Sequence, residues 1–164
     1  MGPLVPEAPT AVVITVSDGV SAGVRDDGSG EALEVMLTEH GFEVARDLVP
    51  DEADRIAAAI RAACGVAPLV LTTGGTGFGL RDVTPEATAS VLERDAPGLV
   101  HAMISRGLEA TPMAALTRAR AGTLGSSLVV NLPGSPKGAV ENLEAIIELI
   151  PHALQLLGGD NRHH

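Results

Sequence analysis

Residues 69–86 read LVLTTGGTGFGLRDVTPE, and this stretch decides the fold. An apolar run ends in Thr72 and Thr73, passes into a glycine-rich loop, and is followed by Thr84-Pro85. This order is typical of a buried strand, a loop and a helix N-terminus. Glycine lets backbone N–H groups approach a ligand closely, and a helix N-terminus adds unpaired donors and the positive end of its dipole. The stretch therefore predicts an anion site, with phosphate as the first ligand to consider.

The glycine-rich loop differs from the common phosphate-binding motifs. A Walker A loop requires a lysine that is absent here, and a dinucleotide fingerprint would require glycine where Leu80 stands. The loop instead carries Arg81 and an acid, Asp82. Two interpretations stay open for the glycines, a ligand loop or a tight strand-to-helix turn, and two for Asp82, a site residue or an Asx-turn. We predict that Thr84 caps the next helix, which should run to about Arg94.

Composition limits the function further. The chain has 164 residues, enough for one domain with a substantial core. Its 21 Asp and Glu against 11 Lys and Arg give a net charge of −10, which argues against nucleic acid and anionic membranes as partners. A phosphate ligand would therefore need backbone amides, a few cations or a bound metal ion close by. One cysteine and no membrane-length apolar run predict a cytoplasmic protein without disulfides.

The rest of the chain repeats the alternation of strands and helices. We expect a flexible tail at residues 1–10, one domain over residues 11–158 and a second tail at residues 159–164. The pattern predicts a layered α/β domain with a mostly parallel sheet and one antiparallel hairpin. The expected strands are residues 11–16, 42–49, 69–72 and the hairpin of 117–124 with 127–130; the expected helices are 30–40, 50–63, 84–94, one from 97, and 136–150 with a kink at Pro151.

Three polar strand ends can meet at one site. Ligands of open α/β sheets collect at the carboxyl ends of the strands. In this chain the predicted strands end in Ser17-Asp18, in residues 73–82 and in residues 131–137. We therefore expect these segments to share one binding site.

Several charged residues allow two interpretations. Spacing alone predicts that Asp51 is the N-cap of a helix, while Asp26, Asp27 and Ser29 either cap the first helix or line the site. Lys137, the only lysine, lies near a predicted helix N-terminus, where the dipole disfavours a cation by about 0.3–1 kcal/mol. An anion nearby would explain its position, and a solvated surface lysine is the alternative.

These segments resemble the MogA/MoaB family of molybdopterin-binding proteins. The resemblance is carried by Ser17-Asp18, by residues 71–77 with 81–86 and by residues 131–137, and it extends from about Ala11 to about Leu157. It implies a three-layer α/β sandwich, usually a homotrimer, that acts in molybdenum cofactor biosynthesis. MogA-type members are adenylyltransferases that join AMP from Mg-ATP to the terminal phosphate of molybdopterin and release pyrophosphate.

The resemblance also implies roles for individual residues. It assigns the two essential aspartates to Asp51, in place of the cap, and to Asp82, and we expect both to place Mg²⁺, in roles that could be exchanged. It further implies ATP as co-substrate, molybdopterin as substrate and a downstream molybdenum-insertion protein as partner. The expected binding residues are Ser17, Asp18, Thr73, Gly74, Gly75, Thr76, Gly77, Asn131, Gly134, Ser135 and Lys137.

Two questions stay open from the sequence. The family includes MoaB-type members without adenylylation activity, and a non-catalytic carrier of molybdopterin would also keep the glycine loop. A carrier would not need paired acids, so the aspartates favour the enzyme. The motifs do not assign the pterin and the nucleotide to particular loops.

Overall fold

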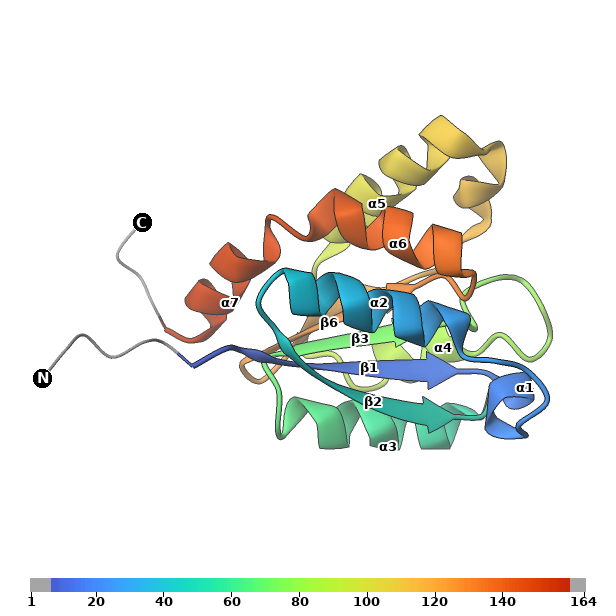
Figure 1. The fold of residues 1–164 in the computed structure, drawn as a ribbon, viewed down its shortest axis with the longest axis horizontal. Helices are drawn as coiled ribbons and strands as arrows, with labels where there is room; N and C mark the ends of the chain where they lie inside the picture. Colours follow the sequence, from blue (N-terminus) through green and yellow to red (C-terminus); the bar gives the residue numbers. More distant parts are fainter. Residues whose placement is uncertain (1–6, 160–164) are drawn as a thin grey trace, which may run out of the picture.

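A six-stranded sheet forms the middle of the molecule (Figure 1). The computed structural model describes residues 7–159, and these strands lie within that part. Five strands point the same way, and β5 runs opposite to both of its neighbours. This confirms the predicted mostly parallel sheet with an antiparallel hairpin. In order across the sheet the strands are β2 (Glu43–Val49), β1 (Thr10–Val16), β3 (Leu69–Thr73), β6 (Ser127–Leu132), β5 (Ala121–Leu124) and β4 (Arg94–Asp95).

Helices cover both faces of the sheet and make the three layers. Alternate strand residues point to opposite faces. Ala11 and Val13 of β1 pack with the helices α2, α5, α6 and α7, whereas Val12 and Ile14 pack with α3 and α4. Figure 1 shows α2 and α6 on one side of the sheet and α3 on the other. The two hydrophobic clusters stabilise the sheet from both sides. The helices are α1 (Asp18–Ser21), α2 (Gly28–Glu39), α3 (Ala53–Cys64), α4 (Thr84–Ala89), α5 (Pro97–Ala110), the 3-10 helix η1 (Pro112–Leu116), α6 (Pro136–Ile146) and α7 (Ile150–Leu157).

The register aligns the carboxyl ends of the central strands. Thr15 of β1 pairs with Thr73 of β3, which in turn pairs with Leu132 of β6. Val16 pairs with Val49 at the end of β2. The loops that follow these four strands therefore leave the sheet at the same edge, as expected for a shared site.

The helix that begins at Thr84 is shorter than predicted. It ends at Ala89, and Arg94–Asp95 form the edge strand β4 instead of a last helical turn. Hydrogen bonds from Glu93 N to Thr123 O and from Ala96 N to Ala121 O, each 2.8 Å, join this segment to β5. Pairing with the sheet overrides the local helical pattern.

The prediction that Thr84 caps this helix is also wrong. Val83 occupies the N-cap position, and Thr84 is the first helical residue. The hydroxyl of Thr84 is buried and donates to the carbonyl of Gly74 at 2.9 Å. Thr84 thus fastens the glycine loop to the helix, which the cap-then-proline pattern did not indicate.

Two further boundaries differ from the prediction. Strand β5 begins at Ala121, and residues 117–120 connect it to η1. The amide of Arg120 donates to the side chain of Asn131. The expected long helix ends at Ile146, and α7 begins at Ile150 with Pro151 in its first turn. Proline lacks an N–H group that the first turn of a helix does not need, so it suits a helix start better than a kink.

The remaining predictions of domain organisation concern the two ends of the chain. Residues 1–6 and 160–164, which make up most of the two predicted tails, lie outside the described residues. The limits of 11 and 158 for the domain stay a prediction, and β1 begins at Thr10. Between residues 7 and 159, no helix has the length and apolar character needed to cross a membrane.

Candidate functional site

A cavity of about 720 Å³ opens at the carboxyl ends of the central strands. It brings together eight of the predicted site residues from four segments of the chain, which supports the expectation of a shared site. Its lining also includes Thr15, Val16, Val20, Arg25, Asp26, Asp27, Gly28, Ser29 and Pro136. The eight predicted residues in the lining are Ser17, Asp51, Thr73, Gly74, Gly75, Asp82, Gly134 and Ser135.

Gly74 and Gly75, in the glycine loop, adopt a backbone conformation that favours glycine. Their φ angles are +105° and +71°, in the left-handed region. A Cβ atom at Gly74 would lie 2.3 Å from the carbonyl oxygen of Val16, and one at Gly75 would lie 2.3 Å from Oγ1 of Thr84. The tight turn thus accounts for both glycines, and their binding of phosphate stays a prediction.

Asp18 and Asp51 join the ends of β1 and β2 by reciprocal hydrogen bonds. The amide of Asp18 donates to Asp51 Oδ2 at 2.9 Å, and the amide of Asp51 donates to Asp18 Oδ1 at 3.0 Å. Arg81 reaches across from the glycine loop and donates to both Asp18 oxygens, at 3.0 and 3.1 Å. Glu52, not Asp51, occupies the N-cap position of α3, so the cap prediction from spacing is wrong.

The pKa values of Asp18 and Asp51 are shifted in opposite directions. Partial burial raises the pKa of Asp51, and the carboxylates of Asp18 and Asp82 add to this, against the amide of Asp18 and the charge of Arg81. The hydrogen bond from Arg81 lowers the pKa of Asp18. Asp18 is therefore paired with a cation, whereas Asp51 faces additional negative charge. A cation bound in the cavity would relieve this crowding.

Asp82 makes a turn contact and lines the cavity at the same time. Its Oδ2 accepts from the amide of Gly79 at 2.8 Å, and its own amide donates to the carbonyl of Gly79 at 3.0 Å. The local turn that competed with a site role is thus present. The turn fixes the carboxylate at the cavity edge, so the two interpretations are compatible.

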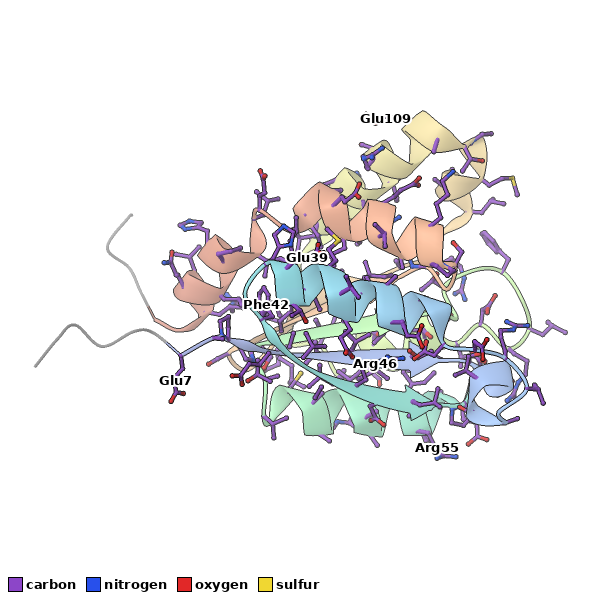
Figure 2. All side chains as sticks on the ribbon, in the orientation of Figure 1. Glu7, Glu39, Phe42, Arg46, Arg55 and Glu109 are labelled. Atoms are coloured by element: carbon purple, nitrogen blue, oxygen red, sulfur yellow. The ribbon has the colours of Figure 1, made fainter. Side chains whose placement is uncertain are left out.

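The N-terminus of α2 forms the opposite wall of the cavity. Asp27 caps this helix by accepting from the amide of Gly30 at 3.0 Å, and it also accepts from Thr15 Oγ1 at 2.9 Å and Arg46 Nη2 at 2.5 Å. Figure 2 labels Arg46, which extends from β2. Asp26, Asp27 and Ser29 line the cavity, so capping and lining both apply to Asp27.

Arg25 was not among the predicted site residues. Arg25 contributes a cationic side chain to the cavity wall. The available signal was an arginine directly before two acids in the loop after β1, in a chain with few cations. In an acidic protein, a cation beside the site is one of the local features that an anionic ligand needs.

Comparisons with known proteins identify the family of this chain. A family model described as "Probable molybdopterin binding domain" matches residues 12–152. The chain belongs to this family. A molybdopterin adenylyltransferase from Helicobacter pylori (strain J99) is 40% identical over 153 residues, covering 90% of this chain and 87% of the relative. The molybdopterin adenylyltransferase of Escherichia coli K12 is 36% identical, covering 90% of this chain and 84% of the relative.

A solved structure agrees with the sequence relatives. The molybdopterin biosynthesis enzyme MoaB from Thermus thermophilus superposes with a TM-score of 0.87 at 47% identity, covering 92% of this chain and 97% of MoaB. The resemblance to the MogA/MoaB family and its three-layer fold are therefore confirmed. The relatives carry both a MoaB name and the adenylyltransferase name.

Asn131, one of the residues assigned through the molybdopterin-binding family, lies in the protein interior. Its Nδ2 donates to the hydroxyls of Thr72 and Thr88, each at 2.9 Å, and its Oδ1 accepts from the amide of Arg120 at 3.0 Å. Asn131 is fully buried and ties β3, α4 and the residue before β5 to β6. Its contacts explain it as a structural residue, and ligand binding by Asn131 stays a prediction.

The third segment of the family pattern contributes a helix cap to the site. Ser135 Oγ accepts from the amide of Gly138 at 3.1 Å, which confirms the predicted cap of α6. The side chain of Lys137 is 83% exposed and lies 4.0 Å from Glu141. This position corresponds to the surface alternative for the lysine, and its contact with an anionic ligand stays a prediction.

A second cavity, of about 430 Å³, adjoins the first through Ser135, which lines both. Thr76 and Gly77 belong to this second cavity, together with Phe78, Met103, Met113 and Leu116. The glycine loop of this family member therefore separates a polar cavity from a more apolar one.

Proposed function

We propose that this protein is a molybdopterin adenylyltransferase. It transfers AMP from ATP to the terminal phosphate of molybdopterin and releases pyrophosphate. The observation that supports this most directly is that Asp51 and Asp82, from different segments, line one cavity with the glycine loop. Relatives at 36–40% identity that align over 84–87% of their own length carry this enzyme name.

The reaction needs two anionic phosphate groups to meet on an acidic protein. Positioning and charge stabilisation supply most of the catalysis in phosphoryl and nucleotidyl transfer. The cavity volume falls within the range of about 300–1,000 Å³ that is usual for small-molecule sites. The amide of Gly74 already donates to the carbonyl of Leu132 at 3.0 Å. We therefore assign phosphate binding to the backbone amides of residues 75–77, to Ser135 and to Arg25.

The acids of this site fit Mg²⁺ as an ion that two protein carboxylates share with its other ligands. Among residues 7–159, no group of three or more His, Cys, Asp or Glu side chains could hold a metal ion. Magnesium is commonly held by one or two carboxylates together with substrate phosphates and water. Asp51 and Asp82 provide two such carboxylates, each oriented by a backbone amide. Bound Mg²⁺ would neutralise phosphate charge during AMP transfer.

Asp51 and Asp82 are therefore the residues to which we assign metal placement. Neither carboxylate is required as a general base, because the attacking phosphate is already ionised near neutral pH. Burial raises the pKa of Asp51 most, and the charges of Asp18 and Asp82, which a bound cation would offset, raise it further. The assignment of one acid to the nucleotide and the other to molybdopterin can be exchanged without changing this argument.

The second candidate function is molybdopterin binding without adenylylation. The observation in its favour is the 47% identity to a structure named MoaB. A carrier would use the glycine loop in the same way. It would gain nothing from two carboxylates that raise the negative charge where a phosphate binds.

One assay separates the two functions. The purified protein is incubated with molybdopterin, ATP and Mg²⁺, and adenylylated molybdopterin and pyrophosphate are measured. We expect both products in equal amounts. Tight binding of molybdopterin without pyrophosphate release would contradict the enzyme and support the carrier.

We further propose that the protein acts as a cytoplasmic homotrimer that passes its product to a molybdenum-insertion protein. The support is the family resemblance. Helix α6 buries Ala139, Leu143 and Ile146 on one face within the monomer, so the apolar residues of this helix do not require an interface.

Light scattering tests the oligomeric state. We expect a mass of about three times the 16.7 kDa of one chain at micromolar concentration. A mass of one chain under these conditions would contradict the trimer.

A further inference from the structure

Arg118, in the segment between η1 and β5, bonds the backbone of the glycine loop. Arg118 Nε donates to the carbonyl of Gly77 at 2.7 Å, and its Nη2 donates to the carbonyl of Asp82 at 2.8 Å. Its backbone amide donates to the carbonyl of Thr76 at 2.8 Å. The third nitrogen, Nη1, forms an ion pair with Glu86 of α4. One residue thus binds the loop at both of its ends.

Between these two ends, Arg81 also connects the loop to the end of β1, through an exposed ion pair with Asp18. Phe78 and Leu80 are 69% and 101% exposed, so their apolar side chains add little buried area. Within the loop, Gly79 and Asp82 bond to each other. These bonds shape the turn without fixing its place relative to the sheet. The guanidinium of Arg118, which also lies 5.9 Å from the ring of Phe78, adds a connection that is less exposed than the Arg81 pair.

We propose that Arg118 is a positioning residue for the adenylyl transfer: it holds residues 76–82 so that the Asp82 carboxylate stays at the edge of the first cavity. The inference rests on the proposed function. The residues described as lining that cavity include Asp82 and not Arg118, so Arg118 acts through the loop and not on the substrates. A planar fork of donors suits this task, because it can bond two carbonyls and a carboxylate at once.

Lysine cannot replace this arrangement. It presents a single ammonium at the end of a flexible stem and cannot span the carbonyls of Gly77 and Asp82 in one fixed geometry. Arg118→Lys should therefore behave more like Arg118→Gln than like the parent protein. Both variants keep the backbone bond to Thr76, so the loop should loosen without the fold being lost.

Limited proteolysis measures the loop without any ligand. Chymotrypsin cleaves after aromatic residues, and this chain has two, Phe78 in the loop and Phe42, which is 5% exposed. We expect cleavage after Phe78, followed by mass spectrometry, to become about tenfold faster in Arg118→Gln and Arg118→Lys because the loop opens more often. Arg106→Gln is the matched control, since Arg106 pairs with Glu109 and Glu144 away from the loop and its loss should leave the rate unchanged.

Kinetics then test the positioning role. With molybdopterin, ATP and Mg²⁺, we expect kcat to fall by about tenfold to a hundredfold in both Arg118 variants, with each KM within about threefold of the parent value. Parent-like cleavage after Phe78, or a kcat within twofold of the parent, would overturn the proposal. If Arg118→Gln fails to fold, Arg118→Lys decides by the same measurements. An inactive parent protein would contradict the proposed function, and the cleavage rate would still decide whether Arg118 holds the loop.

Discussion

Replacing Asp82 with asparagine should lower the rate of adenylylation by about a hundredfold or more. Asparagine keeps the size of the side chain and an oxygen that can accept from the amide of Gly79, as Asp82 Oδ2 does at 2.8 Å. It removes the negative charge that a hard cation requires from its ligands. Single-turnover measurements at saturating Mg²⁺ would give the rate of the chemical step directly.

The structure explains why folding should survive this change. Helix α4 begins with Pro85 in its first turn, and the hydroxyl of Thr84 donates to the carbonyl of Gly74. Arg118 bonds the backbone carbonyl of Asp82, which the substitution retains. The melting temperature should therefore change little, and molybdopterin binding should be largely kept.

A matched control removes the same charge elsewhere. Asp54 lies exposed in the first turn of α3, and Asp54→Asn should leave the adenylylation rate near that of the parent. Activity of Asp82→Asn within a few-fold of the parent would show that Asp82 is only a turn residue. A large loss of thermal stability in Asp82→Asn would lead to the same conclusion.

Local sequence patterns predicted five of the six strands within residues 7–159 and the edge of the sheet where the cavity opens. The run from Leu69 to Thr73 is apolar and β-branched, and all of it is buried in β3. Parallel strands with polar carboxyl ends then place their loops together. These features depend only on residues close together in the chain, so local patterns suffice to predict them.

Contacts between distant segments account for what local patterns could not predict. Asp51 follows a proline and precedes a helix, so it reads as a cap, yet its carboxylate bonds the amide of Asp18, 33 residues away. Arg118 lies 41 residues from Gly77 in a segment that reads as a strand. The helix after Pro85 ends early because Arg94 pairs with Thr123. In each case a long-range hydrogen bond outweighs the local preference.

Asp51→Asn is the second substitution with a large expected effect. The rate of adenylylation should fall by about a hundredfold or more, because the variant loses one of the two charges assigned to metal placement. The amide oxygen of asparagine can still accept from the amide of Asp18, as Asp51 Oδ2 does at 2.9 Å. The reciprocal bond from the Asp51 amide to Asp18 involves the backbone and is unaffected. The junction of β1 and β2 should therefore persist.

Thermal stability should change in the opposite direction from activity. Burial, with the charges of Asp18 and Asp82, raises the pKa of Asp51 above its ordinary value of 3.8, which means that the folded protein disfavours the ionised form. Near neutral pH the group is ionised, and the neutral asparagine removes that cost. Asp51→Asn should then melt at a slightly higher temperature than the parent, a common consequence of neutralising a residue kept for activity.

The difference in thermal stability between Asp51→Asn and the parent should depend on pH. As the pH falls through the raised pKa of Asp51, the folded parent binds a proton before the unfolded chain does, so the parent regains stability relative to the variant. The difference in melting temperature should therefore be largest near neutral pH and should shrink toward zero by about pH 4. Differential scanning fluorimetry of both proteins across this range measures it. A variant that is less stable than the parent at neutral pH would show that the carboxylate of Asp51 stabilises the fold, and its rate loss would then no longer support a role in metal placement.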